Sequence, residues 1–207
     1  MNIDVIIDVV CPWCYLGKKE LDKALEALGR EQFNVTYRPY QLSPDSPAEG
    51  VDRATYYRRK FGNSPQLQQM RSHLTSRGHE LGIHFDFESD CLIGNSMDAH
   101  RLIKWSKGAG CQDEVTDAIM KAYFEQCKLV SDKELLTSIA VKSGMDEGIV
   151  EKLFANTQDV DMIKKEIDYA RSIGVTGVPV YIFDQKLSLV GAEPADKIIQ
   201  TIQSVQA

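Results

Sequence analysis

The chain has 207 residues, of which 43% are hydrophobic and 26% charged, and a formal net charge of -6. This composition is typical of a globular protein and excludes disordered and collagen-like chains. The negative charge gives no general attraction for nucleic acid or anionic lipid, so neither is expected as a partner. The main basic stretch, residues 56–62 (YYRRKFG), is predicted to be the solvated face of a short helix.

The first residues show neither the basic region nor the cleavage site of a secretion signal. No apolar run reaches the roughly 18 residues of a membrane span. We therefore expect a cytoplasmic protein without a membrane partner. Five cysteines, an odd number with one close pair, do not form the pattern of a structural disulfide framework, so the close pair is a candidate for chemistry.

Hydrophobic periodicity predicts a strand at residues 3–9 and then a helix from Pro12, closed by Gly29. A second strand is predicted at residues 33–40. A strand, a helix and a strand of these lengths imply a right-handed crossover with parallel pairing. Two prolines and a glycine in residues 42–50 mark a loop that leaves the sheet.

Residues 51–174 are predicted to form an all-helical block, with segments separated by glycines or by capping Ser and Asp. Strand patterns return at residues 178–184 and 185–191, joined by a tight turn, and Pro194 opens a last amphipathic helix. The same sheet is expected to resume there. We predict an α/β domain of residues 1–50 and 175–207, interrupted by an inserted helical domain of residues 51–174.

The first predicted strand runs into the helix at the sequence CPWC. We place Cys11 at the N-cap and Pro12 at the first helical position, where the missing N–H of proline costs nothing. The unpaired N–H groups of the first turn and the helix dipole then favour a negative sulfur on Cys11. Cys14, one turn further in, can attack Cys11 in a mixed disulfide. Cys11 is therefore the candidate exposed nucleophile and Cys14 the buried resolving thiol.

Four alternative roles for the pair are less favoured. A zinc site would need about two further ligands, and His79 and His84 are five residues apart, on different helix faces. A structural disulfide would close a very short loop with little entropic gain. Haem attachment needs histidine where Tyr15 stands. Inert core thiols would not account for Pro12 at the helix start.

Residues 174–183 (GVTGVPVYIF) place Pro179 at the start of a late strand, where a missing N–H is tolerated. Together with CPWC, with SLVGAEP after the late hairpin, and with the helical block between them, this element resembles the DsbA-like thioredoxin-fold oxidoreductases, most closely the FrnE branch. The resemblance covers nearly the whole chain, including PYQLSPDSPAEG and NSMDAHRL. It implies a thioredoxin fold with a large all-helical insertion.

The resemblance also implies roles for individual residues. Cys11 and Cys14 would be the nucleophile and the resolving thiol, and Val178 with Pro179 would form a cis-proline loop beside them. The backbone before that proline pairs with an extended substrate peptide in this family. Trp13, with Pro12 before it in the motif, would line the substrate groove, although a core position is the alternative for Trp13.

Two polar residues are further candidates near the pair. His100, in NSMDAHRL, would line the cleft or be a packing residue inside the protein. Asp8, three residues before Cys11, would accept the proton of Cys14 or simply be a polar residue at a strand end. The sequence does not decide between the two alternatives for His100 or for Asp8.

The chain departs from the family in two ways. It lacks the secretion signal and the histidine between the cysteines of the periplasmic branch, so a strongly oxidising pair is not expected. It also lacks the C-x4-C pair of some FrnE relatives. Cys111 and Cys127 flank a helical pattern of about fifteen residues, roughly 20 Å long and too long for a disulfide. Cys91, Cys111 and Cys127 are therefore predicted to be unpaired.

We predict dithiol–disulfide exchange on protein or small thiol substrates, with no metal, nucleotide or flavin needed and with glutathione as a candidate co-substrate. The strongest alternative is a glutathione-dependent isomerase of the 2-hydroxychromene-2-carboxylate type or a kappa-class transferase. Those proteins normally have serine at the first motif position and G-x-D-R where this chain has GAEP. The third possible function is that of a non-catalytic binding or chaperone-like module. The residues indicate no oligomeric state.

Overall fold

The computed structural model describes residues 1–62 and 65–206, so Ser64, at the start of one predicted helical segment, lies outside the described residues. The strands are β1 Asn2–Ile7, β2 Asn34–Pro39, β3 Val51–Asp52, β4 Leu92–Ile93, β5 Val180–Phe183 and β6 Leu187–Val190. The helices are α1 Pro12–Leu28, α2 Arg53–Phe61, α3 Pro65–Glu80, α4 Met97–Gly108, α5 Gln112–Gln126, α6 Lys133–Lys142, α7 Glu147–Phe154, α8 Val160–Ser172 and α9 Ala195–Gln206, with a 3-10 turn at Arg30–Gln32.

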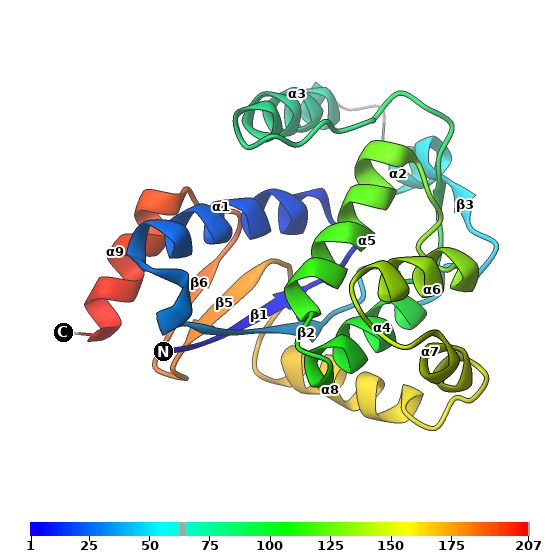
Figure 1. Cartoon of the computed structure of the whole chain (residues 1–207). Helices are drawn as coiled ribbons and strands as arrows, with labels where there is room; N and C mark the ends of the chain where they lie inside the picture. Colours follow the sequence, from blue (N-terminus) through cyan, green and yellow to red (C-terminus); the bar gives the residue numbers. More distant parts are fainter. Residues whose placement is uncertain (63–64, 207) are drawn as a thin grey trace.

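Strands from the two ends of the chain form one four-stranded sheet in the order β2-β1-β5-β6 (Figure 1). β1 and β2 are parallel, and α1 makes the crossover between them. β5 is antiparallel to both β1 and β6. The predicted parallel unit at the start of the chain and the return of the sheet at its end are both found.

The two faces of β1 are buried against different helices because successive side chains alternate across a strand. Ile3, Val5 and Ile7 belong to a large buried cluster that includes residues of α1 and α9. Ile6 instead packs with Ala170 of α8 in a second cluster. The sheet therefore lies between α1 with α9 on one side and α8 on the other (Figure 1).

β1 ends at Ile7, two residues earlier than predicted. The Asp8 carboxylate accepts hydrogen bonds from the amides of Val10 at 3.4 Å and Leu42 at 2.7 Å. The Asp8 carbonyl accepts another from the amide of Cys11 at 3.0 Å. These bonds turn the chain out of the sheet and direct it into α1 at the next residue.

Helices α2 to α8 separate the two halves of the sheet (Figure 1). Unlike the predicted all-helical block, this segment contains two short strands, β3 and β4, which pair in antiparallel fashion. α4 and α8 contact β2, and α3 contacts α1. The large buried cluster joins residues of the sheet and of these helices. The division into domains at residues 50/51 and 174/175 therefore stays a prediction.

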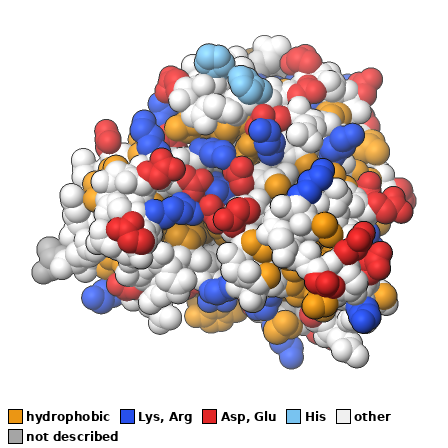
Figure 2. Space-filling model, in the orientation of Figure 1, with side chains coloured by type: hydrophobic (Ala, Val, Ile, Leu, Met, Phe, Trp, Pro, Cys, Tyr) orange, Lys and Arg blue, Asp and Glu red, His pale blue; other side chains and the backbone are white. Residues whose placement is uncertain are grey.

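Acidic and basic side chains are interspersed on the face shown in Figure 2. In the basic stretch at the end of α2, Arg58, Arg59 and Lys60 are exposed as predicted, but Tyr57 beside them is buried. The stretch is therefore exposed on one side of α2 only. Within the described part of the chain, no helix combines the length and the apolar character that crossing a membrane requires.

Candidate active site

The two cysteines of the CPWC stretch lie at the start of α1. Cys11 is the N-cap residue, with φ -94° and ψ 114°, and Pro12 is the first helical residue, as predicted. The amide of Cys14 donates to the carbonyl of Cys11 at 3.0 Å. The carboxyl end of β1 thus delivers both sulfurs to the N-terminus of a 17-residue helix, where unpaired amides favour a negative group.

A loop from far along the chain lies against these cysteines. The peptide bond between Val178 and Pro179 is cis. The Cys11 thiol donates to the carbonyl oxygen of Val178, with Sγ 3.6 Å from that oxygen. The sheet explains this contact, because Ile6 near the end of β1 pairs with Val180 at the start of β5. The register of the sheet therefore joins residues 167 positions apart in the sequence.

Gly17 of α1 faces the same loop and was not expected to contribute to the site. A Cβ atom at this position would overlap the hydroxyl of Tyr181 and lie 3.0 Å from Cγ of Pro179. The missing side chain lets α1 approach β5 and the loop before it. An isolated glycine inside a predicted helix is a signal of such close packing, because glycine otherwise costs helix stability.

The two sulfurs differ in how their exposure compares with the prediction. Cys14 is 0% exposed, as predicted for the resolving thiol, but Cys11 is only 4% exposed, so its predicted exposure is wrong. Cys11 belongs to the same buried cluster as Tyr57 of α2, and Trp13 packs against this cluster. The Trp13 ring centroid lies 5.7 Å from that of His73 on α3. A residue of α3 therefore packs on Trp13 at the start of α1, which no pattern near the cysteines indicates.

Burial raises the pKa of the Cys14 thiol well above its ordinary value of 9.0. A hydrogen bond with Cys11 and the charge of Cys11 raise this pKa further, whereas a backbone hydrogen bond at Asp8 lowers it. Cys14 therefore keeps its proton at neutral pH in the reduced protein. It has to lose that proton before it can act as a nucleophile.

Asp8 and His100 are buried together near the cysteines. The charge of Asp8 is one of the causes that raise the pKa of Cys14, which places its carboxylate close to that sulfur. His100 is buried, and its Nε2 lies 3.4 Å from Oδ1 of Asp8. This position corresponds to the packing alternative for His100. Its role in substrate binding stays a prediction.

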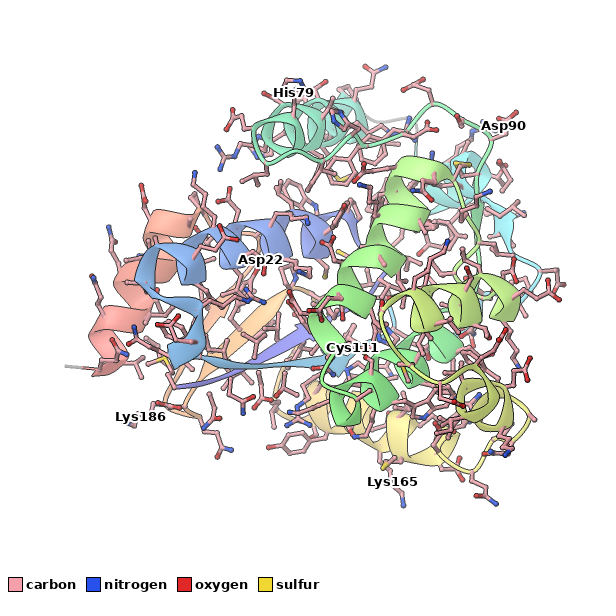
Figure 3. All side chains as sticks on the ribbon, in the orientation of Figure 1. Asp22, His79, Asp90, Cys111, Lys165 and Lys186 are labelled. Carbon is pink, nitrogen blue, oxygen red and sulfur yellow. A yellow bond between two sulfur atoms is a disulfide. The ribbon has the colours of Figure 1, made fainter. Side chains whose placement is uncertain are left out.

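The prediction that the three other cysteines are unpaired is wrong for two of them. Cys91 and Cys127 form a disulfide, with their Cα atoms 5.2 Å apart, and Cys111 is free as predicted. α5 lies between Cys111 and Cys127, so its length keeps only these two cysteines apart. The loop before β4, which carries Cys91, hydrogen-bonds to the last turn of α5 and meets Cys127 there. Figure 3 shows Asp90, the neighbour of Cys91, far from Cys111.

His79 and His84 lie close together although they are on different faces of a helical pattern. α3 ends at Glu80, and the chain turns through Gly82 with φ 75°, so that the two rings come within 6.0 Å. Among residues 1–62 and 65–206, no group of three or more His, Cys, Asp or Glu side chains is arranged to hold a metal ion.

The raised pKa of Cys14 predicts how the stability of the reduced protein depends on pH. The unfolded chain loses this proton near pH ~8.5, but the folded protein keeps it to higher pH. Stability from this group is therefore complete below about pH 8.5 and is lost as pH rises, by up to about 1.4 kcal/mol per pH unit. Urea unfolding of the reduced protein should show a shallower decline between about pH 8.5 and 10 for Cys14→Ala. An equal decline in both proteins would contradict the assignment.

Comparison with known proteins gives consistent matches over the chain. A family model described as a DSBA-like thioredoxin domain matches residues 2–203. The uncharacterized protein YwbO of Bacillus subtilis is 22% identical over 208 residues, covering 100% of this chain and 98% of YwbO. A probable DsbA oxidoreductase from Streptomyces coelicolor superposes with a TM-score of 0.90 and 28% identity, covering 100% of this chain and 90% of that structure.

Two further solved structures share the fold at lower identity. The 2-hydroxychromene-2-carboxylate isomerase has a TM-score of 0.72 and 16% identity, over 100% of this chain and 95% of that structure. The cytosolic disulfide reductase DsbM from Pseudomonas aeruginosa, with GSH, has a TM-score of 0.69 and 14% identity, over the whole length of both chains. The fold is therefore shared by proteins described as oxidoreductases and as an isomerase.

Proposed function

Because the chain belongs to the family of DSBA-like thioredoxin domains, we propose that it is a thiol–disulfide oxidoreductase with Cys11 as nucleophile and Cys14 as resolving thiol. The main observation that supports this proposal is the contact between Cys11 Sγ and the Val178 carbonyl. It brings a helix N-terminus, two free thiols and the loop before Pro179 to one place. Within the family, the CPWC and GVTGVP motifs favour the FrnE branch.

In the reducing direction, the Cys11 thiolate attacks one sulfur of a substrate disulfide. The substrate S–S bond breaks, a mixed disulfide forms and one substrate thiolate leaves. Cys14 then loses its proton, for which Asp8 is the proposed acceptor, and attacks Cys11 Sγ. The second substrate thiolate leaves, and two electrons have passed from the Cys11–Cys14 pair to the substrate. The reverse sequence transfers the disulfide to a dithiol.

The proposal places this exchange in the cytoplasm, on protein or small thiol substrates, with glutathione as a co-substrate. The DsbM structure supports this choice, since that protein is described as cytosolic and is solved with GSH. Pro12, Trp13, Val178 and Pro179 would line the substrate groove. The exchange itself needs no other cofactor, because the electrons reside on the sulfurs.

Trapping of mixed disulfides tests the proposal. Cys14→Ser should accumulate covalent complexes with substrate or glutathione, because no second thiol can displace the bound partner. Cys11→Ser should trap nothing and lose disulfide reduction. Cys111→Ser, which removes a buried free thiol elsewhere, is the control and should behave like the wild type. Mass spectrometry after non-reducing electrophoresis reads out each complex.

The isomerase alternative is tested by the same proteins. The likeness to 2-hydroxychromene-2-carboxylate isomerase motivates it, although cysteine stands at position 11. If no cysteine variant traps a partner and the wild type isomerises a chromene carboxylate in the presence of glutathione, the oxidoreductase proposal is wrong. If neither activity appears, the binding-module alternative takes its place.

A further inference from the structure

Arg53, the first residue of α2, is a buried cation that forms no ion pair with the residues that the structure describes. It is 2% exposed, and its Nη2 donates to the carbonyls of Asp86 at 2.5 Å and Ser89 at 3.3 Å. Its Nη1 is buried and has no acceptor. The ion pairs found among the described residues do not include Arg53. A buried charge without an ion-pair partner is costly, and Nη1 is a donor that the described residues leave unpaired.

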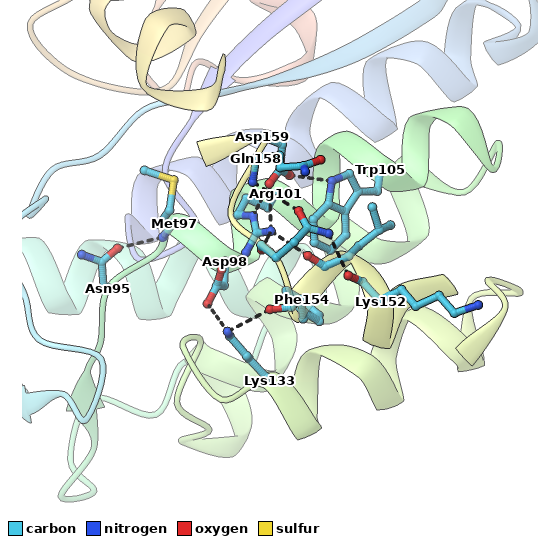
Figure 4. A network of polar contacts seen from close by, with 12 residues as sticks. Asn95, Met97, Asp98, Arg101, Trp105, Lys133, Lys152, Phe154, Gln158 and Asp159 are labelled. Atoms are coloured by element: carbon cyan, nitrogen blue, oxygen red, sulfur yellow. Dashed lines mark hydrogen bonds and ion pairs between the residues drawn. The ribbon is translucent and has the colours of Figure 1, made fainter. Parts of the chain in front are cut away.

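Arg101 is a buried arginine of the same protein whose guanidinium donors do have acceptors (Figure 4). Its guanidinium donates to the carboxylates of Asp98 at 2.7 Å and Asp159 at 2.8 Å, and also to two backbone carbonyls. Arg53 has the two carbonyls but neither carboxylate. The nearby Asp86 carboxylate forms no ion pair with Arg53: its Oδ1 accepts two backbone amides of its own loop, and these bonds, with a smaller contribution from the charge of Arg53, lower the pKa of Asp86.

Arg71 of α3 is a second cation, and it lies over two aromatic side chains, Tyr57 of α2 and Phe87. Its guanidinium carbon lies 5.8 Å from the ring centroid of Tyr57 and 5.9 Å from that of Phe87. Arg71 is half-buried, and its Nε has no acceptor. The buried hydroxyl of Tyr123 is a further donor without an acceptor. Three side chains from α2, α3 and α5 thus present unused hydrogen-bond donors.

The aromatic side chains around these donors, Tyr57, Phe87 and Tyr123, belong to the same buried cluster as Cys11. Burial, and next the negative charge of Cys11, raise the pKa of Tyr57 to about 12, whereas the charges of Arg53 and Arg71 lower it. Burial and the charge of Tyr57 raise the pKa of Tyr123, and Arg53 again lowers it. These causes agree with the geometry. Tyr57 belongs to the same buried cluster as Cys11, Arg53 lies one helical turn before it on α2, and Arg71 lies over its ring.

We propose that Arg53 and Arg71 form an anion subsite next to Cys11 that binds the carboxylate of a small thiol or disulfide whose sulfur reacts with Cys11. A carboxylate fits the planar donor geometry of guanidinium groups. A small molecule is favoured over an acidic protein segment because Arg53 and Cys11 are both nearly inaccessible. The subsite rests on the proposed function, because it selects among substrates of the Cys11–Cys14 pair.

Two aromatic disulfides test the subsite. Each ring of dithiobis(nitrobenzoate) carries a carboxylate, whereas dithiodipyridine carries none. With either probe, the Cys11 thiolate breaks the S–S bond and releases one aryl thiolate. Cys14 then loses its proton, with Asp8 again as the proposed acceptor, displaces the second aryl thiolate and closes the Cys11–Cys14 disulfide, so two electrons pass to the probe. Stopped-flow absorbance gives both rate constants, after subtraction of the rate measured with Cys11→Ser.

Arg71→Gln is expected to lower the ratio of the carboxylate-probe rate constant to the neutral-probe rate constant about tenfold, the effect of losing one charge-assisted hydrogen bond. Arg53→Gln should lower the ratio in the same direction, provided that its circular dichroism shows a folded protein. Arg59→Gln is the matched control, since it removes the same charge from an exposed position of α2. Its ratio should stay within about twofold of the wild type.

A ratio that stays at the wild-type value in Arg71→Gln, or that falls equally in Arg59→Gln, would overturn the subsite. The failure of the oxidoreductase proposal has a different signature. In that case Cys11→Ser reacts with both probes as fast as the wild type does, so neither rate constant contains a contribution from Cys11. The two failures are therefore distinguishable in one set of measurements.

Discussion

Arg101→Met is expected to lower the free energy of unfolding by about 3 to 5 kcal/mol, the range for removing one partner of a buried ion pair. The side chain of Arg101 is 1% exposed and holds Asp98 and Asp159. Methionine fills a similar volume but leaves both carboxylates without their cation. The indole of Trp105 still donates to Asp159 at 2.7 Å, which compensates only part of the loss.

Urea unfolding followed by circular dichroism measures this effect, with Arg171→Met as the control. The side chain of Arg171 is 43% exposed, its Nη1 lies 3.6 Å from Asp168 and its Nη2 donates to the carbonyl of Gln41 at 3.2 Å, so its loss should cost only about 1 kcal/mol. Arg101→Lys should fall between the two, because one ammonium group cannot replace all the donors of the guanidinium. Equal losses in Arg101→Met and Arg171→Met would contradict the expected role of the network.

The Arg101 network also bears on the position of the candidate active site. It ties α4 to the residues between α7 and α8 (Figure 4). α4 carries His100, which lies against Asp8 at the turn before Cys11. α8 covers the face of the sheet opposite α1. The stability of this network therefore helps to fix the sheet beneath the cysteines, with Arg101 as a positioning residue.

The parts of the fold that the sequence predicts correctly depend on local patterns. The alternation in β1 and the helical spacing after Pro12 identify the strand and the helix, and Gly29, with φ 86°, ends α1 where predicted. The loop before Pro179 also has a local pattern, because proline in a sheet is tolerated mainly at the first residue of a strand, on an edge strand or at a bulge. Such patterns, with the family resemblance they support, are sufficient to predict that Cys11 and Val178 lie together.

The parts that the sequence does not predict depend on partners far along the chain. Cys11 is buried in the same cluster as Tyr57 of α2, and local spacing gives no indication of where α2 will lie. The motif NSMDAHRL is a weak signal by itself, yet Asn95 holds the backbone of the loop at residues 44–46 and Arg101 is fully paired inside the protein. A buried arginine and its acceptors 50 or more residues away are visible only after folding.

Removal of the Cys91–Cys127 disulfide is expected to lower the free energy of unfolding by about 3 to 4 kcal/mol, because a cross-link over this sequence separation of 36 restricts the unfolded chain. The comparison is made in a Cys11→Ser and Cys14→Ser background, so that only one disulfide is in question. Cys91→Ala with Cys127→Ala is measured against Cys111→Ala, which removes a buried thiol but no cross-link. Similar losses in the two proteins would contradict the expected effect of the disulfide.

The same disulfide should also influence the arginine subsite. The carbonyl of Cys91 accepts the amide of Arg53 at 2.9 Å, and the loop before it supplies both carbonyls that hold the Arg53 guanidinium. With Cys11 and Cys14 intact, Cys91→Ala with Cys127→Ala should therefore lower the ratio of the two probe rate constants, in the direction of Arg53→Gln. A destabilised protein with an unchanged ratio would show that the disulfide restrains the unfolded chain and does not position Arg53.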